Sequence, residues 1–302
     1  MNIDFRFNYY IKNWKNKETI KISKSLKEFK QDQIIYYPGP NNPAPKNFNS
    51  QYGCWDKMFW WNQKFSLNFE CISISADGID NKKLPAIVKV RYIDDEKAGI
   101  LAPLAYRRHW GNLNKKLDII PWNEKKNECI WRGAATGIQD SGKKTGEWEN
   151  VRIKFCHKWK DKFNVGITVD FGRWDPIYNK PKMKIEEMLK YKYIISVPGN
   201  DKDSGINWKL ASNSVVLMTT PRIESWLMEG LLKPWVHFVP LENDYSDLEE
   251  KIYWCKKNDK KCQIIVSNAN KFMDQFKNIK VEEEIFNKIK QHYKNTFKFV
   301  DN

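Results

Sequence analysis

The fold of this chain is decided by residues 193–259, which begin YIISVPGNDKDSGINWKLASNSVVLM. Short apolar runs rich in β-branched residues predict strands buried on both faces of a sheet, here at 193–197, 214–218 and 236–241. A polar turn at 199–205 and a short helix at 206–213 are expected between the first two strands. Strands that alternate with helices predict parallel βαβ units. Ligands bind beyond the carboxyl ends of such strands, so we expect the polar turn to face a ligand.

Two further helices are predicted downstream. One is expected to begin at Ser246-Asp247-Leu248-Glu249 with a capping box, in which Ser246 and Glu249 bond backbone amides reciprocally. The other covers residues 281–299, where an apolar side chain recurs at every fourth position: Ile285, Ile289, Tyr293 and Phe297. The C-terminal half therefore belongs to the α/β class.

The N-terminal half carries a second set of strand signals. Residues 69–76 alternate between apolar and polar side chains and predict a strand that stops at Asp77-Gly78. Residues 84–90 predict another strand, after a turn that contains lysines. A chain of 302 residues exceeds a typical single core, so two domains are expected.

Composition narrows the function classes. A hydrophobic content of 41% argues against disorder. The net charge of +15 fits nucleic acid, an anionic membrane or an anionic small ligand. Because the lysines are scattered without a long basic block, a small anionic ligand is favoured, and steeply salt-dependent DNA binding would be needed to support a nucleic-acid-binding protein. The 14 Trp and 13 Tyr residues fit either sugar platforms or core packing.

The cysteines and the hydropathy of the chain indicate where in the cell the protein is located. The six cysteines form no CxxC pair and no zinc-like spacing: Cys54, Cys71, Cys129, Cys156, Cys255 and Cys262. Residues 1–7 lack the apolar core of a signal peptide, and no apolar run approaches about 20 residues, the length of a membrane span. We therefore expect a soluble, cytoplasmic protein with reduced thiols, and no metal site.

A series of short motifs resembles the C-terminal half of glycosyltransferase family 90, which includes protein O-glucosyltransferases and viral xylosyltransferases. The motifs follow in the order and spacing of that family: Trp131-Arg132-Gly133, Gly199-Asn200-Asp201, Trp208-Lys209, Ser212-Asn213-Ser214-Val215-Val216, Glu224-Ser225-Trp226 and Lys233-Pro234-Trp235-Val236-His237-Phe238-Val239-Pro240. Each motif alone is weakly specific, whereas the ordered series over roughly 130 residues is informative.

The resemblance implies a GT-B fold, in which two Rossmann-like domains face a central cleft. We expect an acceptor-side domain at 1–124, a nucleotide-sugar domain at 125–279, and a C-terminal helix at 280–302 that packs back on the N-terminal domain. The implied activity is inverting, metal-independent transfer from a UDP-sugar to a glycan hydroxyl, with UDP-xylose as first donor and UDP-glucose as second. The acceptor could belong to a viral capsid protein or a bacterial surface polymer. A non-catalytic nucleotide-sugar or carbohydrate-binding relative stays open as the alternative.

Inverting transfer needs a base for the acceptor hydroxyl. Asp77 is the candidate, because it closes a predicted strand and matches in position the catalytic aspartate that the resemblance implies. From the residues alone, a turn-forming Asp-Gly is an equally good interpretation. Asp80, Asp94 and Asp95 are weaker rivals.

The leaving diphosphate needs positive groups. Arg132 is the first candidate that the resemblance implies, and it precedes a small-residue turn that contains Gly133 and Thr136. From the residues alone, a surface charge is the more common interpretation of such an arginine. Arg152 resembles a second family position and could instead brace that turn. Many family members carry an arginine in the helix after the 199–205 turn, where this chain has none, so the amides of Ser204 and Gly205 and the charge of Lys209 are the expected substitutes.

Further contacts come from the resemblance. Gly199, Asn200 and Asp201 are expected near the donor, and Glu224, Trp226 and Glu229 are expected to hold ribose or sugar, although solvated or capping acids are an equally good interpretation. Three residues match basic positions on the acceptor side: Arg91, Arg108 and His109. His109 could titrate near neutrality, but a packed structural role is favoured. His237 is expected to be structural, within a buried strand.

Overall fold

A computed structural model describes residues 2–22, 34–38, 70–74, 85–96, 98–102, 113, 118–140, 148–169, 172 and 174–301. The chain divides into two compact units. Unit 1 comprises residues 1–110, 222–230 and 276–302, and unit 2 comprises residues 111–221 and 231–275. Each unit is described by itself, and the expected cleft of a GT-B fold stays a prediction.

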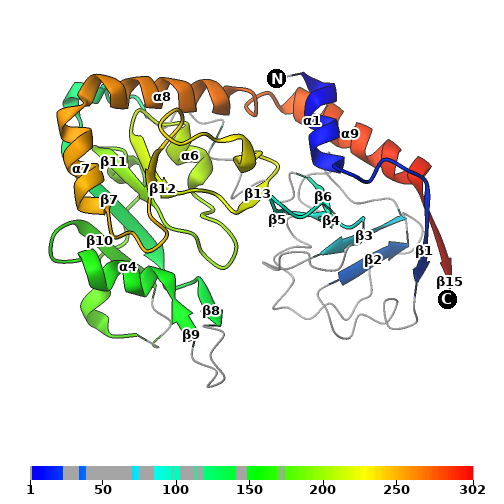
Figure 1. Ribbon diagram of the computed structural model, residues 1–302, viewed down its shortest axis with the longest axis horizontal. Coiled ribbons are helices and arrows are strands. Elements are labelled where there is room, and N and C mark those ends of the chain that lie inside the picture. The colour runs from blue at the N-terminus through cyan, green and yellow to red at the C-terminus, as the bar shows by residue number, and fades with distance from the viewer. Residues whose placement is uncertain are drawn as a thin grey trace. The chain divides into compact units, whose positions relative to one another are not determined.

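Unit 2 is built on a five-stranded parallel sheet, which confirms the α/β class (Figure 1). Its strands, in spatial order, are β10 (Asn164–Val169), β7 (Lys126–Ala134), β11 (Tyr191–Ser196), β12 (Val215–Thr219) and β14 (Val239–Leu241). Numbered along the chain, this order is 2-1-3-4-5. The chain therefore reverses its direction across the sheet between β7 and β11, which makes these two strands the topological switch point.

Helices pack beside the strands of this sheet. They are α4 (Val151–Trp159) beside β10, α8 (Asp259–Asp274) beside β12, α7 (Leu248–Lys257) beside β14, and the short α5 (Ile185–Met188) and α6 (Ile206–Leu210). Two 3₁₀ turns, η3 (Trp122–Glu124) and η4 (Pro176–Tyr178), and an antiparallel pair, β8 (Ile138–Asp140) and β9 (Trp148–Asn150), complete the described elements of unit 2. A further 3₁₀ turn, η5 (Glu229–Leu231), lies where the chain passes from unit 1 back to unit 2.

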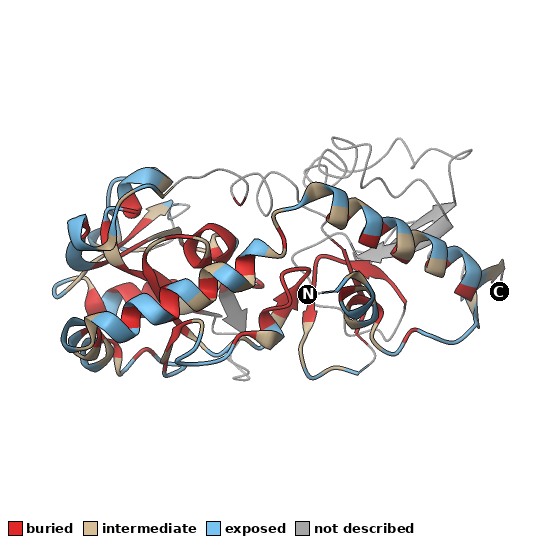
Figure 2. Ribbon diagram, turned by 90° about the horizontal axis from the view of Figure 1, so that it is seen from above, coloured by how far each residue is buried: buried red, intermediate tan, exposed pale blue. Residues whose placement is uncertain are grey.

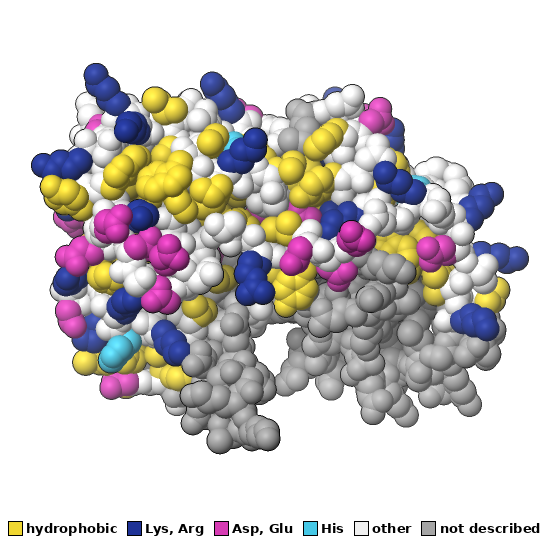
Figure 3. Space-filling model, viewed as in Figure 1, with side chains coloured by type: hydrophobic (Ala, Val, Ile, Leu, Met, Phe, Trp, Pro, Cys, Tyr) yellow, Lys and Arg dark blue, Asp and Glu magenta, His cyan; other side chains and the backbone are white. Residues whose placement is uncertain are grey.

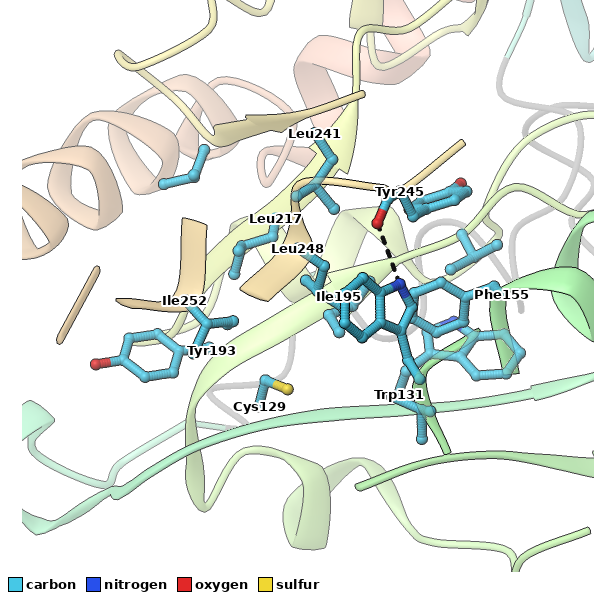
Figure 4. Close-up of a cluster of buried hydrophobic side chains, with 14 of the residues drawn as sticks. Cys129, Trp131, Phe155, Tyr193, Ile195, Leu217, Leu241, Tyr245, Leu248 and Ile252 are labelled. Carbon is cyan, nitrogen blue, oxygen red and sulfur yellow. Dashed lines mark hydrogen bonds between the residues drawn. The ribbon is translucent and has the colours of Figure 1, made fainter. Parts of the chain in front are cut away.

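Aromatic and aliphatic side chains from the sheet, α4 and α7 form the core of unit 2 (Figure 4). Trp131 and Tyr245 each contact the ring of Phe155 edge-on, with ring centroids 5.5 and 5.1 Å apart. The Tyr245 carbonyl oxygen accepts a hydrogen bond from Trp159 Nε1 at 3.1 Å, drawn dashed in the figure. The core thus fixes the segment that follows β14 to the helix that follows β7.

Unit 1 contains a four-stranded sheet in the order β2 (Ile34–Pro38), β3 (Glu70–Ile74), β4 (Ile87–Val88) and β6 (Ile100–Leu101). The first pair is antiparallel and the other two pairs are parallel. β5 (Val90–Tyr92) pairs antiparallel with β13 (Ile223–Ser225), and β1 (Glu18–Ile22) pairs parallel with β15 (Phe297–Asp301).

The C-terminal helix α9 (Ile279–Thr296) packs against α1 (Ile3–Ile11), near the start of the chain. Buried and exposed positions alternate along α8 and α9 (Figure 2), as expected of amphipathic helices at a surface. In the described part of the chain, no helix has both the length and the apolar composition that a membrane span requires.

Several local predictions are confirmed and others are wrong. The strands predicted at 69–76, 193–197 and 214–218 appear as β3, β11 and β12. The helix predicted at 206–213 ends at Leu210, and the strand predicted at 84–90 divides at Lys89 into β4 and β5. The strand predicted at 236–241 starts only at Val239, because a turn held by the bond from His237 N to Lys233 O (3.0 Å) precedes it.

His237 therefore lies in a turn, where its Nδ1 accepts a hydrogen bond from Lys233 N at 2.9 Å. The capping box predicted for α7 is also wrong. Asp247 precedes the helix without capping it and instead accepts a hydrogen bond from Glu242 N at 2.9 Å. Ser246 N donates back to Asp244 Oδ1 at 3.0 Å. The acidic loop between β14 and α7 is thus stabilised by its own side chains.

A buried ion pair joins α1 to α9. Arg6 Nη2 donates a hydrogen bond to Glu282 Oε2 at 2.7 Å, Arg6 Nη1 lies 2.7 Å from Glu282 Oε1, and both side chains are 1% exposed. Burial raises the pKa of Glu282 above its ordinary value, although Arg6 opposes the rise. The pair therefore stabilises the unit only while both charges are present, since a lone charge would stay buried without compensation.

Replacing Arg6 by Met should lower the free energy of unfolding by about 3–5 kcal/mol, because Glu282 loses the cation that it pairs with in the described structure. The double variant Arg6→Met with Glu282→Met should recover most of this loss. Urea denaturation followed by circular dichroism measures both changes. Lys162→Met is the control, since its pair with Glu249 is exposed and worth at most about 1 kcal/mol.

Candidate functional site

The switch point between β7 and β11 is the place where a parallel sheet of this order binds ligands. Two loops leave the carboxyl ends of these strands. Residues 135–137 follow β7, and residues 197–205 follow β11. The second loop is the polar turn that the sequence predicts to face a ligand.

Arg152 ties these two loops together from the first turn of α4. Its Nη1 donates to Ala134 O at 3.0 Å and to Thr136 Oγ1 at 2.8 Å, on the side of β7. Its Nε donates to Pro198 O at 3.0 Å and its Nη2 to Val197 O at 2.9 Å, on the side of β11. One planar guanidinium thus sets the spacing between the two loops.

Asn150 sets the position of Arg152. Its Oδ1 accepts hydrogen bonds from the backbone amides of Arg152 and Ile153, at 3.0 Å each, and so caps the helix α4. Its Nδ2 donates to Ala135 O at 2.9 Å, so the helix start is attached to the loop after β7. The sequence reasoning missed Asn150, although an asparagine directly before a helix is a recognisable cap signal.

Small residues let the two loops approach each other closely. Gly137 has φ +85°, which favours glycine, and its amide donates to Asn200 Oδ1 at 2.8 Å. A Cβ at Gly199 would lie 3.2 Å from Thr136 Oγ1 and 3.3 Å from Arg152 Nη2. Gly137 and Gly199 therefore bring the two loops together beside the guanidinium of Arg152.

Largely buried charges surround this edge of the sheet. Asp203 and Lys209 form an ion pair, and Asp203 also accepts hydrogen bonds from Ser196 Oγ at 2.7 Å and Gly205 N at 2.8 Å. In contrast, no carboxylate of the described residues forms an ion pair with Arg152. Burial lowers the pKa of Arg152, an effect that Asp203 and Asp201 oppose only from a distance.

The balance of charge at this edge is positive. Among the buried charged side chains described here, Arg152, Lys202 and Lys209 are opposed by Asp201 and Asp203, which leaves one positive charge among five. A positive edge is suited to an anionic ligand such as a phosphate or diphosphate. Gly205 and Lys209, however, already bond Asp203, so neither is available in this structure as the expected substitute for the missing arginine.

The structure does not bring Arg132 to this edge. Arg132 lies within β7, and its guanidinium bonds Asn164 O at 2.9 Å, Asn164 Oδ1 at 2.6 Å and Pro181 O at 3.2 Å. Asn164 is the first residue of β10, so the side chain is directed toward the amino end of the sheet. Gly133 also lies inside β7, paired with Ile167 of β10. A residue inside a strand projects from a face of the sheet rather than from its carboxyl end.

The predicted carboxylates Glu224 and Glu229 lie in unit 1, with Trp226. Arg91 pairs with Glu224 at 2.9 Å, and both side chains have no exposed surface. Ser225 donates its amide to Glu229 Oε2 at 2.6 Å, and Glu229 is 4% exposed. These side chains hold segment 222–230 in unit 1, and neither Arg91 nor Glu224 has exposed surface with which to contact an acceptor or a donor.

Some predicted residues lie outside the described part of the chain. These are Asp77 and its rival Asp80, and the acceptor-side residues Arg108 and His109. Among the described residues, His, Cys, Asp and Glu form no group of three that could hold a metal ion. Four thiols are buried and unpaired: Cys129, Cys156, Cys255 and Cys262.

Comparison with known proteins identifies the family of this chain. The model of the family described as "Glycosyl transferase family 90" matches residues 105–300, which contain both loops of the switch point and Arg152. The chain belongs to this family. The resemblance found in the ordered motifs is confirmed.

Three relatives have similar sequences over part of their length. O-glucosyltransferase LpsA of Dichelobacter nodosus is 33% identical over 223 residues, which cover 73% of this chain and 63% of LpsA. Protein O-glucosyltransferase 2 of Danio rerio is 31% identical over 156 residues, or 50% of this chain and 29% of its own length. Uncharacterized protein 179R of Invertebrate iridescent virus 6 is 32% identical over 186 residues, or 52% and 16%. The chain spans less than two thirds of each of these relatives.

The pH dependence of stability should reveal the charge of Asp203. Burial alone would raise the pKa of this carboxyl, but Lys209 and Arg152 hold it below 3.8. A pKa depressed in the folded state stabilises the fold above the unfolded value, and this contribution is lost as the pH falls through the folded value. Asp203→Asn should therefore cost most stability near neutrality, and the difference from the unaltered protein should shrink below about pH 4.

Urea denaturation at a series of pH values measures this difference. Asp161→Asn serves as the control, because Asp161 is 82% exposed and pairs only with its neighbour Lys160. A cost of Asp203→Asn that stays constant from neutral to acidic pH would contradict the proposed charge of Asp203.

Proposed function

We propose that this protein is an inverting, metal-independent glycosyltransferase that moves a sugar from a UDP-sugar to a hydroxyl of a glycan acceptor. One observation carries the proposal. In a chain of glycosyl transferase family 90, the buried guanidinium of Arg152 joins the two loops of the switch point and leaves that edge positive. This is the charge that a departing diphosphate requires.

Each part of the site has a chemical role in this proposal. The Thr136 and Asn200 side chains and the glycine-bearing turns surround the diphosphate, and Arg152 supplies the positive potential. Asp77 takes the proton of the acceptor hydroxyl, whose oxygen then bonds the anomeric carbon from the face opposite UDP. The bond between that carbon and the diphosphate oxygen breaks, and its electron pair leaves with UDP. Attack from the opposite face inverts the anomeric configuration.

The names of the relatives support a choice of donor. LpsA and the Danio rerio protein are both called O-glucosyltransferases, and we therefore propose UDP-glucose as the first donor and UDP-xylose as the second. For the acceptor we keep the coarser proposal of a glycan or glycoprotein hydroxyl.

A donor panel tests the function. UDP release should be measured from UDP-glucose, UDP-xylose, UDP-galactose and UDP-GlcNAc, with and without EDTA. We expect one preferred donor and a rate that EDTA leaves unchanged. Asp77→Asn should abolish release while UDP still binds, because a base acts on the acceptor and not on the nucleotide. UDP binding without release from any donor, even with glycan acceptors present, would favour a non-catalytic binding relative.

A pair of arginine variants tests the diphosphate site. Arg152→Met should weaken UDP binding about tenfold or more, because the charge and the spacing of both loops are lost together. Arg132→Met should leave the UDP affinity within about twofold, since its guanidinium is directed toward the start of β10. Isothermal titration calorimetry on folded variants measures both affinities. If Arg132→Met weakened UDP binding more than Arg152→Met did, Arg132 and not Arg152 would be the residue that binds the diphosphate.

A further inference from the structure

A second recess lies in unit 2, beyond the carboxyl ends of β12 and β14 rather than at the switch point. Its volume is about 340 Å³, within the range of small-molecule sites. The residues that line it come from these strand ends, the 233–238 turn and the start of α7: Thr220, Trp235, Pro240, Leu241, Glu242, Asn243, Asp247 and Lys251. We call this recess the Trp235 pocket.

The turn presents Trp235 to solvent in a fixed position. The indole is 43% exposed, and its backbone adopts φ +63°, a region that a bulky side chain rarely enters. The turn is closed by bonds from Trp235 N to Phe238 O (2.8 Å) and from Val236 N to Lys233 O (3.2 Å). Trp254 contacts the indole edge-on, with ring centroids 4.7 Å apart. A strained residue that holds an exposed aromatic ring is typical of a binding site.

Four polar groups of the pocket make no hydrogen bond with the described residues of the chain. The carboxylate of Glu242, the amide of Asn243, the hydroxyl of Thr220 and the indole N–H of Trp235 make no hydrogen bond with a described residue. Asp247 and Lys251, in contrast, pair with each other at 3.3 Å. The pocket therefore offers acceptors on Glu242, Asn243 and Thr220, donors on Asn243, Thr220 and Trp235, and a flat apolar ring.

Charge excludes two classes of ligand. Glu242 and Asp247 outnumber Lys251, so the lining carries a net negative charge and disfavours a diphosphate. Lys251 Nζ lies 5.9 Å from the centroid of the indole, so its positive charge repels a second cation at that ring but does not repel a neutral ligand. The class that remains is a neutral molecule with one apolar face and many hydroxyl groups.

We propose that the Trp235 pocket binds a neutral sugar ring of a saccharide. The C–H face of the ring packs on the indole of Trp235, and its hydroxyls donate to Glu242 and exchange hydrogen bonds with Asn243 and Thr220. Hydrophobic and acidic side chains lie next to each other on the face of the molecule seen in Figure 3. The lining of the pocket combines the same two kinds, Trp235 and Leu241 with Glu242 and Asp247, as such a ligand needs. This inference goes beyond the proposed transfer, because a saccharide can bind here whether or not the switch point turns over a donor.

Saturation-transfer difference NMR tests the inference with the methyl β-glycosides of glucose, galactose and xylose, each with and without saturating UDP. We expect ring C–H signals from at least one glycoside, and we expect them to persist when UDP is bound. Trp235→Gly should weaken that glycoside about tenfold, since glycine adopts φ +63° without strain and only the indole is lost. Glu242→Gln, which keeps the shape, should weaken it about threefold or more.

Two further variants sharpen the test. Trp235→Phe keeps an aromatic face and should retain most of the affinity. Tyr253→Ala removes a 62% exposed ring on α7 that does not line the pocket, and it should change nothing. Glycoside signals that UDP abolishes, together with a loss of UDP binding in Trp235→Gly, would assign the pocket to the nucleoside and overturn the inference. Absence of signals, or signals that Trp235→Gly leaves unchanged, would overturn it as well. Since UDP binding is measured separately, failure here leaves the proposed function standing.

Discussion

The four hydrogen bonds of the Arg152 guanidinium are the interaction on which the candidate site depends. Three of them go to the carbonyl groups of Ala134, at the end of β7, and of Val197 and Pro198, directly after β11. Because the guanidinium is planar and rigid, it fixes both loops at once. Its charge has no carboxylate within pairing distance among the described residues, so a positive potential is built into the edge before any ligand arrives. Removing the guanidinium would remove both this charge and the hydrogen bonds that hold the two loops.

Two regions at the carboxyl edge of the same sheet differ in the charge and type of their side chains. At β7 and β11 the described edge carries the cationic Arg152, whereas at β12 and β14 it is aromatic and acidic. β12 is the immediate neighbour of β11, so only one or two strand spacings of about 4.8 Å separate the two regions along the sheet. An anionic nucleotide and a neutral saccharide are therefore favoured at different places along one edge. The scattered positive charge of the whole chain does not by itself create this division.

Unit 1 shows how buried charges can resemble a functional site. Glu224 lies opposite Arg91 in the antiparallel pair of β13 and β5, and opposite charges that face each other across two strands attract. Arg6 and Glu282 repeat the arrangement between α1 and α9. In each pair, removing one charged side chain would leave the other buried without a partner and would lower the free energy of unfolding. Segment 222–230 is in this way held to unit 1, although it follows directly on a strand of unit 2.

The sequence by itself determined the apolar runs that become β11 and β12, the polar turn between them, the amphipathic α9 and the ordered motifs of the family, because each of these is a local pattern. Only the tertiary structure decided which loops meet. The strand order places the turns after β7 and β11 together, and side-chain direction brings Arg152 to them while Arg132, inside its strand, is directed toward Asn164. Likewise, Glu224 has the same local sequence whether it holds a ligand or an arginine 133 residues away. Pairing between residues so distant in sequence depends on how strands and helices pack, and no short stretch of sequence contains that information.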